Sequence, residues 1–262
     1  MRPDISEFSY GYAITDELIN WQGTALYAAP VFPSLWDEGH LGYDVGLDRH
    51  NGIPLFIQFK LSDCMVRANA YEYQYGPLSL PYYRMHIRPA MHSAQHEMLL
   101  ALEEDTGAEV TYCAPAFHTS EELNSAYLNH NVCSQSVWIA PSWIGPLPDN
   151  YSHYVAFQLN GPRIFYSDPK PIDHSASFRQ FGERLNLKHR QLSDTALSED
   201  SLRQMAESLA HIAKKRKDIS VEEKARTERV LVDRPPIQQV AYYAGVYLDC
   251  QFFTLHARQQ LR

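Results

Sequence analysis

GYDVGLDRHNGIPLFIQFKLSD, residues 42–63, predicts two β-strands joined by a tight turn. Asn51-Gly52 readily adopts the positive φ angles that a hairpin turn needs. The second strand, residues 54–61, is nearly all apolar, as expected of a strand buried on both faces. Gln58 and Lys60 interrupt it two positions apart, so their side chains share one face, near Asp44 of the first strand. An amide and an ammonium group in a buried strand call for a chemical explanation.

The composition is that of an ordinary globular protein. The chain has 262 residues, of which 45% are hydrophobic and 21% charged, enough for one sizeable domain or a domain with a substantial appendage. It has neither an apolar run of about eighteen residues nor a signal-peptide pattern, so we expect a cytoplasmic protein with no membrane contact. The net charge of -8 argues against broad adhesion to nucleic acid, although it is compatible with a local basic cleft.

Hydrophobic periodicity predicts a helix, three strands, a helix and a strand in the first half of the chain. In that order, the predicted elements span residues 8–21, 24–32, the two halves of 42–63, 93–104 and 110–117. Beyond residue 170 the sequence predicts a polar amphipathic helix over 198–219 and an aromatic helix over 237–260. We therefore expect a domain over 1–170 and a helical C-terminal region, 171–262, packed on it.

Asp44 followed by Gln58-Phe59-Lys60 at the end of a hydrophobic strand resembles the PD-(D/E)xK nuclease superfamily. It is more closely similar to the QxK version found in Mrr-type restriction endonucleases. The resemblance covers roughly residues 8–117, with Tyr43 in place of the proline of the motif. It implies an α/β fold with a restriction-endonuclease-like core, in the order αβββαβ, whose mixed central sheet is flanked by helices.

The resemblance also implies metal-dependent hydrolysis of phosphodiester bonds, most directly in DNA, with RNA not excluded. Asp44, Gln58 and Glu17 would be the ligands of Mg²⁺ or Mn²⁺, Glu17 either directly or through another ligand. Lys60 would orient the attacking water, help to deprotonate it and stabilise the charge that develops on the phosphate. Gln58 in place of an acid removes one negative charge, which weakens the expected metal binding.

Three further residues are candidates for binding substrate. Gln95 is at the start of the helix after the predicted sheet, where it either faces the phosphate backbone or has a core-facing or solvent role. Arg84 and Arg88 lie on one face of an extended segment, where they are either phosphate contacts or plain surface charges. His92 and His96 have the spacing of a zinc-binding helix, but they form neither HExxH nor HxxEH and no third ligand is evident.

A second interpretation is a degenerate nuclease fold kept as a scaffold or binding subunit. The acidic net charge and Gln58 favour it, and the tyrosines within residues 71–83 would suit a protein–protein surface. A close triangle of Glu17, Asp44 and Lys60 would favour the enzyme, and scattering of the three would favour the scaffold. By fold-level analogy alone, the nuclease would be an anti-phage effector controlled by a protein partner, and a homodimer would allow both strands to be cut.

Overall fold

The computed structural model describes residues 1–21, 24–26, 52–91, 93–106, 108–166, 168–172, 176–191, 197–214, 220, 222, 225, 227, 229 and 231–257. Its helices are α1 (Glu7–Asn20), α2 (Tyr71–Tyr75), α3 (Gln95–Thr106), α4 (Ser120–Leu128), α5 (Pro141–Ile144), α6 (Phe178–Gln191), α7 (Glu199–Lys214) and α9 (Pro236–Leu248). Among the described residues, no helix combines the length and apolarity needed to cross a membrane.

The central sheet is mixed, and its strand order is β1-β10-β2-β5-β6. These strands are β1 (Thr24–Leu26), β10 (Gln251–Ala257), β2 (Gly52–Phe59), β5 (Glu109–Pro115) and β6 (Ser136–Ile139). β2 pairs in parallel with β5, and the chain passes through α3 between them, as a parallel pair requires. β10 pairs antiparallel with both β1 and β2. The expected mixed α/β architecture is therefore confirmed.

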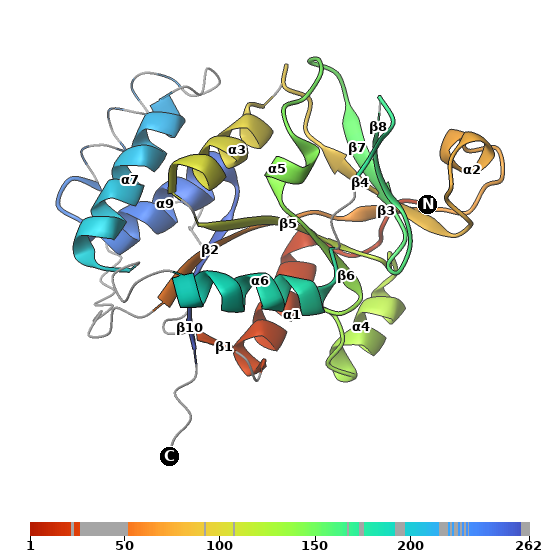
Figure 1. Cartoon of the computed structure of the whole chain (residues 1–262), viewed down its shortest axis with the longest axis horizontal. Helices are drawn as coiled ribbons and strands as arrows, with labels where there is room; N and C mark the ends of the chain where they lie inside the picture. Colours follow the sequence, from red (N-terminus) through yellow and green to blue (C-terminus); the bar gives the residue numbers. More distant parts are fainter. Residues whose placement is uncertain are drawn as a thin grey trace.

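A second, antiparallel sheet has the order β3-β4-β7-β8-β9 and extends beside the first, with α2 at its outer edge (Figure 1). Its strands are β3 (Ser62–Met65), β4 (Tyr82–Ile87), β7 (His153–Phe157), β8 (Arg163–Tyr166) and β9 (Lys170–Pro171). β3 begins three residues after β2 ends, so the chain leaves the central sheet for the second one immediately after Lys60.

Helices cover both faces of the central sheet (Figure 1). α3, α7 and α9 pack on one face against Phe56, Val110 and Tyr112, together with apolar residues of the second sheet. α1, α4 and α6 pack on the other face against Leu55, Ile57 and their neighbours. β2 is thus buried on both sides, which explains its continuous apolar sequence.

Side-chain caps set the starts of α1 and α4. Ser6 caps α1 by accepting a hydrogen bond from the backbone N–H of Ser9 at 2.9 Å. Thr119 and Glu122 form a capping box at the start of α4. Both caps satisfy backbone donors that the helix itself leaves without partners.

The expected helix over 237–260 is wrong beyond Leu248. Asp249 adopts the left-handed conformation, with φ 56° and ψ 38°, which ends α9. The chain then continues as β10, whose Phe252, Phe253 and Thr254 belong to residue types that favour strands. The C-terminal region is therefore not purely helical, because it supplies a strand to the central sheet.

The predicted hairpin partner of β2 lies on residues outside those described, and so does Asp44. β10 takes a neighbouring position beside β2, while β5 takes the other. Both edges of β2 are thus occupied by strands that are distant in the sequence.

Candidate functional site

A buried polar cluster lies at the carboxyl end of β2, on the face that α3 and α9 cover. The strand alternates as the sequence predicted: Phe56 faces α3 and α9, whereas Leu55 and Ile57 face α1 and α6. Gln58 and Lys60 continue the Phe56 side. Gln58 is 0% exposed and Lys60 is 7% exposed, so both polar groups are enclosed by protein.

Gln95, the first residue of α3, joins these two side chains. Its Oε1 accepts a hydrogen bond from Lys60 Nζ at 3.1 Å, and its Nε2 donates to Gln58 Oε1 at 2.6 Å and to the backbone carbonyl of Leu248 at 2.9 Å. An ammonium group can only donate, so this pattern fixes which end of the Gln95 amide carries the oxygen. The network ties together the end of β2, the start of α3 and the end of α9.

Two charged residues form the outer rim of the cluster. Asp249 Oδ2 lies 3.4 Å from Gln95 Nε2 and 3.0 Å from the Arg88 guanidinium. The Arg88 and Asp249 side chains are 53% and 46% exposed, so solvent reaches the cluster from this side. The structure therefore brings the predicted residues Gln58, Lys60, Gln95 and Arg88 together and adds Asp249 to them.

Glu7, in the first turn of α1, acts electrostatically on the same cluster. Burial lowers the pKa of Lys60, and the charge of Arg88 lowers it further, while Glu7 opposes the shift. The pKa of Glu7 is raised by its protein surroundings, although its side chain reaches the surface, and the nearby Lys60 limits that rise. Lys60 thus holds its proton less firmly than a surface lysine does.

The predicted role of Glu17 does not match its position. Its carboxylate accepts a hydrogen bond from the backbone N–H of Cys133 at 3.1 Å, ahead of β6. Glu7 and Glu17 are ten residues apart in one helix, or about 15 Å along its axis, and the acid near Lys60 is Glu7. The expected triangle of Glu17, Asp44 and Lys60 is not tested, because Asp44 lies outside the described residues, but Glu7 is the acid of α1 that acts on Lys60.

Arg84 is also placed away from the cluster. Its guanidinium is 2.6 Å from the carboxylate of Glu72, which is 0% exposed, and it lies 4.9 Å above the ring of Tyr154 in the second sheet. This buried ion pair anchors α2 to β4.

His96 binds Tyr112 and the backbone carbonyl of Gly145, both at 2.8 Å, so its two ring nitrogens have internal partners. His92 lies outside the described residues.

Within the described part of the chain, no three His, Cys, Asp or Glu side chains are grouped to hold a metal ion. In the cluster, Gln58 Oε1, the Leu248 carbonyl and Asp249 Oδ2 all approach Gln95 Nε2. The amide nitrogen carries two hydrogens, which serve the two nearer oxygens, and Asp249 Oδ2 is paired with Arg88. These oxygens therefore surround a hydrogen-bond donor, and as they stand they do not fit a divalent cation.

Asp249 is the residue that sequence reasoning missed. It is 191 positions from Gln58, which is too far for any local pattern to link them.

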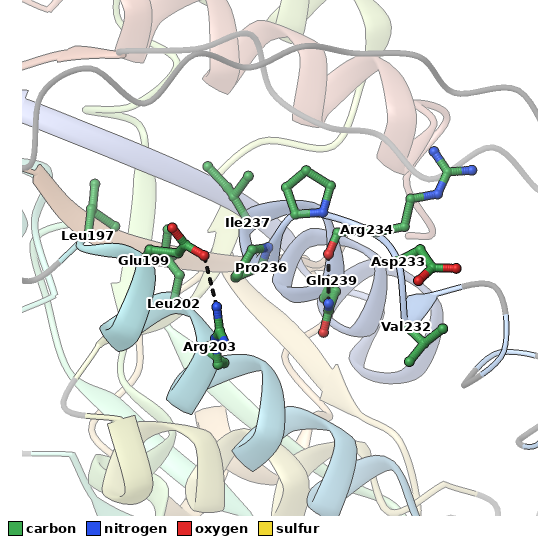
Figure 2. Close-up of a pocket in the computed structure, with 11 residues that line it drawn as sticks. Leu197, Glu199, Leu202, Arg203, Val232, Asp233, Arg234, Pro236, Ile237 and Gln239 are labelled. Atoms are coloured by element: carbon green, nitrogen blue, oxygen red, sulfur yellow. Dashed lines mark hydrogen bonds and ion pairs between the residues drawn. The ribbon is translucent and has the colours of Figure 1, made fainter.

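A separate pocket of ≈ 670 Å³ lies between the starts of α7 and α9 (Figure 2). Its walls include the apolar side chains of Leu202 and Ile237, and Glu199 and Arg203 form an ion pair of 2.8 Å on α7. None of its lining residues belongs to the polar cluster. The cluster, with its buried amide and ammonium groups, is the better candidate for chemistry.

Searches against protein-family models, curated proteins and solved structures found no match for this chain. The resemblance to PD-(D/E)xK nucleases stays a hypothesis, and it depends on the residues of the cluster and on the elements that position them.

Proposed function

We propose that the chain is a metal-dependent nuclease that hydrolyses phosphodiester bonds, most directly in DNA. The observation that carries the proposal is the buried Lys60–Gln95–Gln58 network at the carboxyl end of β2. Burying an ammonium group opposite a neutral amide costs stability, because the amide accepts a hydrogen bond but does not neutralise the charge. A group kept at such a cost, with a shifted pKa and beside a solvent-reached rim, is typical of a functional site.

Each residue of the cluster has a role in this proposal. Lys60 orients the attacking water and, with its lowered pKa, takes part in its deprotonation. Gln95 holds Lys60 and Gln58 in position, and Arg88 binds the substrate phosphate at the exposed rim. Gln58 Oε1 and the Leu248 carbonyl are both bound to Gln95 Nε2, and the described residues contain no group of three His, Cys, Asp or Glu side chains for the Mg²⁺ or Mn²⁺ that the resemblance implies. No step of the proposal is therefore assigned to the cation.

The arrangement of elements supports a restriction-endonuclease-like core. A helix, α1, precedes the sheet, and the strand with Gln58 and Lys60 pairs in parallel with β5 through α3. The insertion of β10 beside β2 departs from the expected strand order. An anti-phage role, a controlling protein partner and a homodimer remain parts of the proposal that depend on the resemblance alone.

Cleavage assays test the proposal directly. Plasmid, single-stranded DNA and RNA are incubated with the native chain and Mg²⁺ or Mn²⁺, with and without chelator, and the same assay is run on Lys60→Met. Lys188→Met is the matched control, because Lys188 is a partly buried lysine on α6 that pairs with Glu109 at 3.1 Å, away from the cluster. We expect Lys60→Met to lose at least about 10²-fold in rate and Lys188→Met to keep it. Equal cutting by both variants would refute the assignment of Lys60.

The scaffold is the second candidate, favoured by the position of Glu17 and by exposed tyrosines on α2. Tyr71, Tyr73 and Tyr75 are 55%, 41% and 74% exposed, as in surfaces that bind other proteins. If the native chain cuts none of the three substrates with either metal, the scaffold becomes the preferred interpretation.

A further inference from the structure

We infer that the carboxylate of Asp249 is an internal competitor of substrate: in the free protein it occupies the position at Arg88 where a phosphate group binds, and the phosphate displaces it. The inference rests on the proposed function for the role of Arg88 and adds a means of regulation to it. It goes beyond the motif, because Asp249 lies outside residues 8–117, which the resemblance covers.

The end of α9 and the start of β10 hold Asp249 beside the end of β2. β10 and β2 run antiparallel, and Gln251 is opposite Ile57. The residues ahead of Gln251 therefore lie beside Gln58 and Lys60. The backbone N–H of Asp249 donates to a carbonyl of α9, which fixes the turn that directs its side chain to the rim of the cluster.

The groups around the Asp249 carboxylate suit an anion. Its Oδ2 lies 3.0 Å from Arg88 Nη2 and 3.4 Å from Gln95 Nε2, and both nitrogens are hydrogen-bond donors. Lys60 Nζ binds the other end of the same amide at 3.1 Å, and its charge attracts both Asp249 and the second acid nearby, Glu7. Asp249 thus supplies an anion that these positive groups attract while no substrate is bound.

Local stability does not account for an acid at this position. The φ of Asp249, 56°, is in the left-handed region, where glycine is the default residue at a helix end. A carboxylate at the C-terminus of α9 is also disfavoured by the helix dipole, which favours cations at that end. The contact with Arg88 is the interaction that opposes both effects, so the carboxylate is held at the rim but not firmly.

A phosphate group has the means to displace the carboxylate. The contact between Arg88 and Asp249 joins one nitrogen to one oxygen, and the two side chains are 53% and 46% exposed, so solvent weakens their attraction. A guanidinium binds phosphate through two parallel hydrogen bonds, which are stronger than a single contact. Until a phosphate arrives, the fraction of molecules with a free Arg88 is reduced, and the apparent affinity for phosphate falls by the same fraction.

Titration of inorganic phosphate into the full chain, with chelator present and at low ionic strength, tests the inference apart from cleavage. The NMR signal of the Arg88 Nε–H group reports binding at the proposed position. We expect Asp249→Asn to bind phosphate about three- to tenfold more tightly than the native chain, because it frees Arg88 and removes a negative charge. Asparagine also tolerates the left-handed conformation, so the turn is kept.

Asp233→Asn is the matched control, because it removes the same charge at the opposite end of α9, about 20 Å away along a helix of 13 residues. We expect it to leave the phosphate affinity unchanged. A double-mutant cycle with Arg88→Met shows whether Asp249 acts through Arg88. In the Arg88→Met background, Asp249→Asn should give less than half of the gain, on a logarithmic scale, that it gives in the native chain.

Three results would overturn the inference: equal phosphate affinity of Asp249→Asn and the native chain, an equal gain from Asp233→Asn, or no phosphate binding by either the native chain or Asp249→Asn. The cleavage assay separates these results from failure of the proposed function. If the native chain cuts DNA while Asp249→Asn gains no phosphate affinity, the nuclease stands and the competitor fails. If Asp249→Asn gains phosphate affinity but nothing is cut, the competitor stands and the nuclease fails.

Discussion

Gln95→Leu removes the side chain that connects three elements of the fold, at nearly constant volume. The substitution leaves Lys60 Nζ, Gln58 Oε1 and the Leu248 carbonyl without the partners that lie 2.6–3.1 Å away in the native chain. A buried polar group that loses its partner costs about 1–3 kcal/mol, and more if it is charged. Water enters from the half-exposed Arg88–Asp249 rim, so we take the low end of that range for each group.

The expected loss is therefore about 3 kcal/mol of unfolding free energy. For a chain of this size, 1 kcal/mol corresponds to roughly 2–4 °C in Tm, so Gln95→Leu should melt about 6–12 °C below the native chain. Circular dichroism during a thermal scan, with chelator present, measures the shift without any contribution from bound metal.

Gln158→Leu is the matched control, because the same chemical change is made where water can replace the lost bonds. Gln158 Nε2 donates to Ser79 Oγ at 2.9 Å in an exposed setting. We expect a loss below about 0.5 kcal/mol, or about 1–2 °C. If Gln95→Leu melts no lower than Gln158→Leu, the Gln95 network does not hold these elements together and the reasoning is refuted.

Three other predictions concern charge and packing. The pKa of Lys60 is lowered in the folded chain, so between that pKa and 10.5 the folded chain binds fewer protons than the unfolded chain. The free energy of unfolding of the native chain, relative to that of Lys60→Met, should therefore rise with pH in this window. Urea unfolding from pH 7 to 10 measures this difference, and a constant difference would contradict the prediction. Arg84→Met removes the cationic partner of the buried Glu72 carboxylate, which keeps a hydrogen bond from Tyr82, so it should cost about 3–5 kcal/mol in urea unfolding yet leave the cleavage rate of the folded protein unchanged; a folded variant that no longer cuts would return Arg84 to the site. Gly182→Ala would direct a Cβ into the ring of Trp21, so we expect a loss of about 1–3 kcal/mol, and a Tm equal to that of the native chain would show that the ring moves freely.

Sequence patterns predicted the parts of the fold that depend on neighbouring residues. Ser6 and Thr119 cap helices as their types suggest, and period-two alternation placed Gln58 and Lys60 on one face. The convergence of Gln95 on these two side chains agrees with its predicted place at the start of the helix after the sheet.

The remainder depends on packing between distant segments. Glu7 and Glu17 are both acids of one helix, and only the way α1 packs decides which of them is near Lys60. Residues 237–248 and 251–257 are both apolar and aromatic, the first rich in tyrosine, valine and leucine and the second in phenylalanine. The sequence pattern therefore did not predict the change from helix to strand at Asp249. β2 pairs with β10, which lies about 200 residues later in the sequence, and no local sequence pattern predicts such a pairing.

The place of β10 also determines when this protein can fold. β2, the middle strand of the central sheet, is synthesised early, but its antiparallel neighbour leaves the ribosome only after residue 257 has been added and has cleared the exit tunnel. Until then one edge of a nearly all-apolar strand has no native partner, and such edges attract other chains. We therefore expect the nascent chain to be prone to association through β2, and the polar cluster at the end of β2 cannot assemble before synthesis has passed Asp249. Under the proposed function, the site would be incomplete until then.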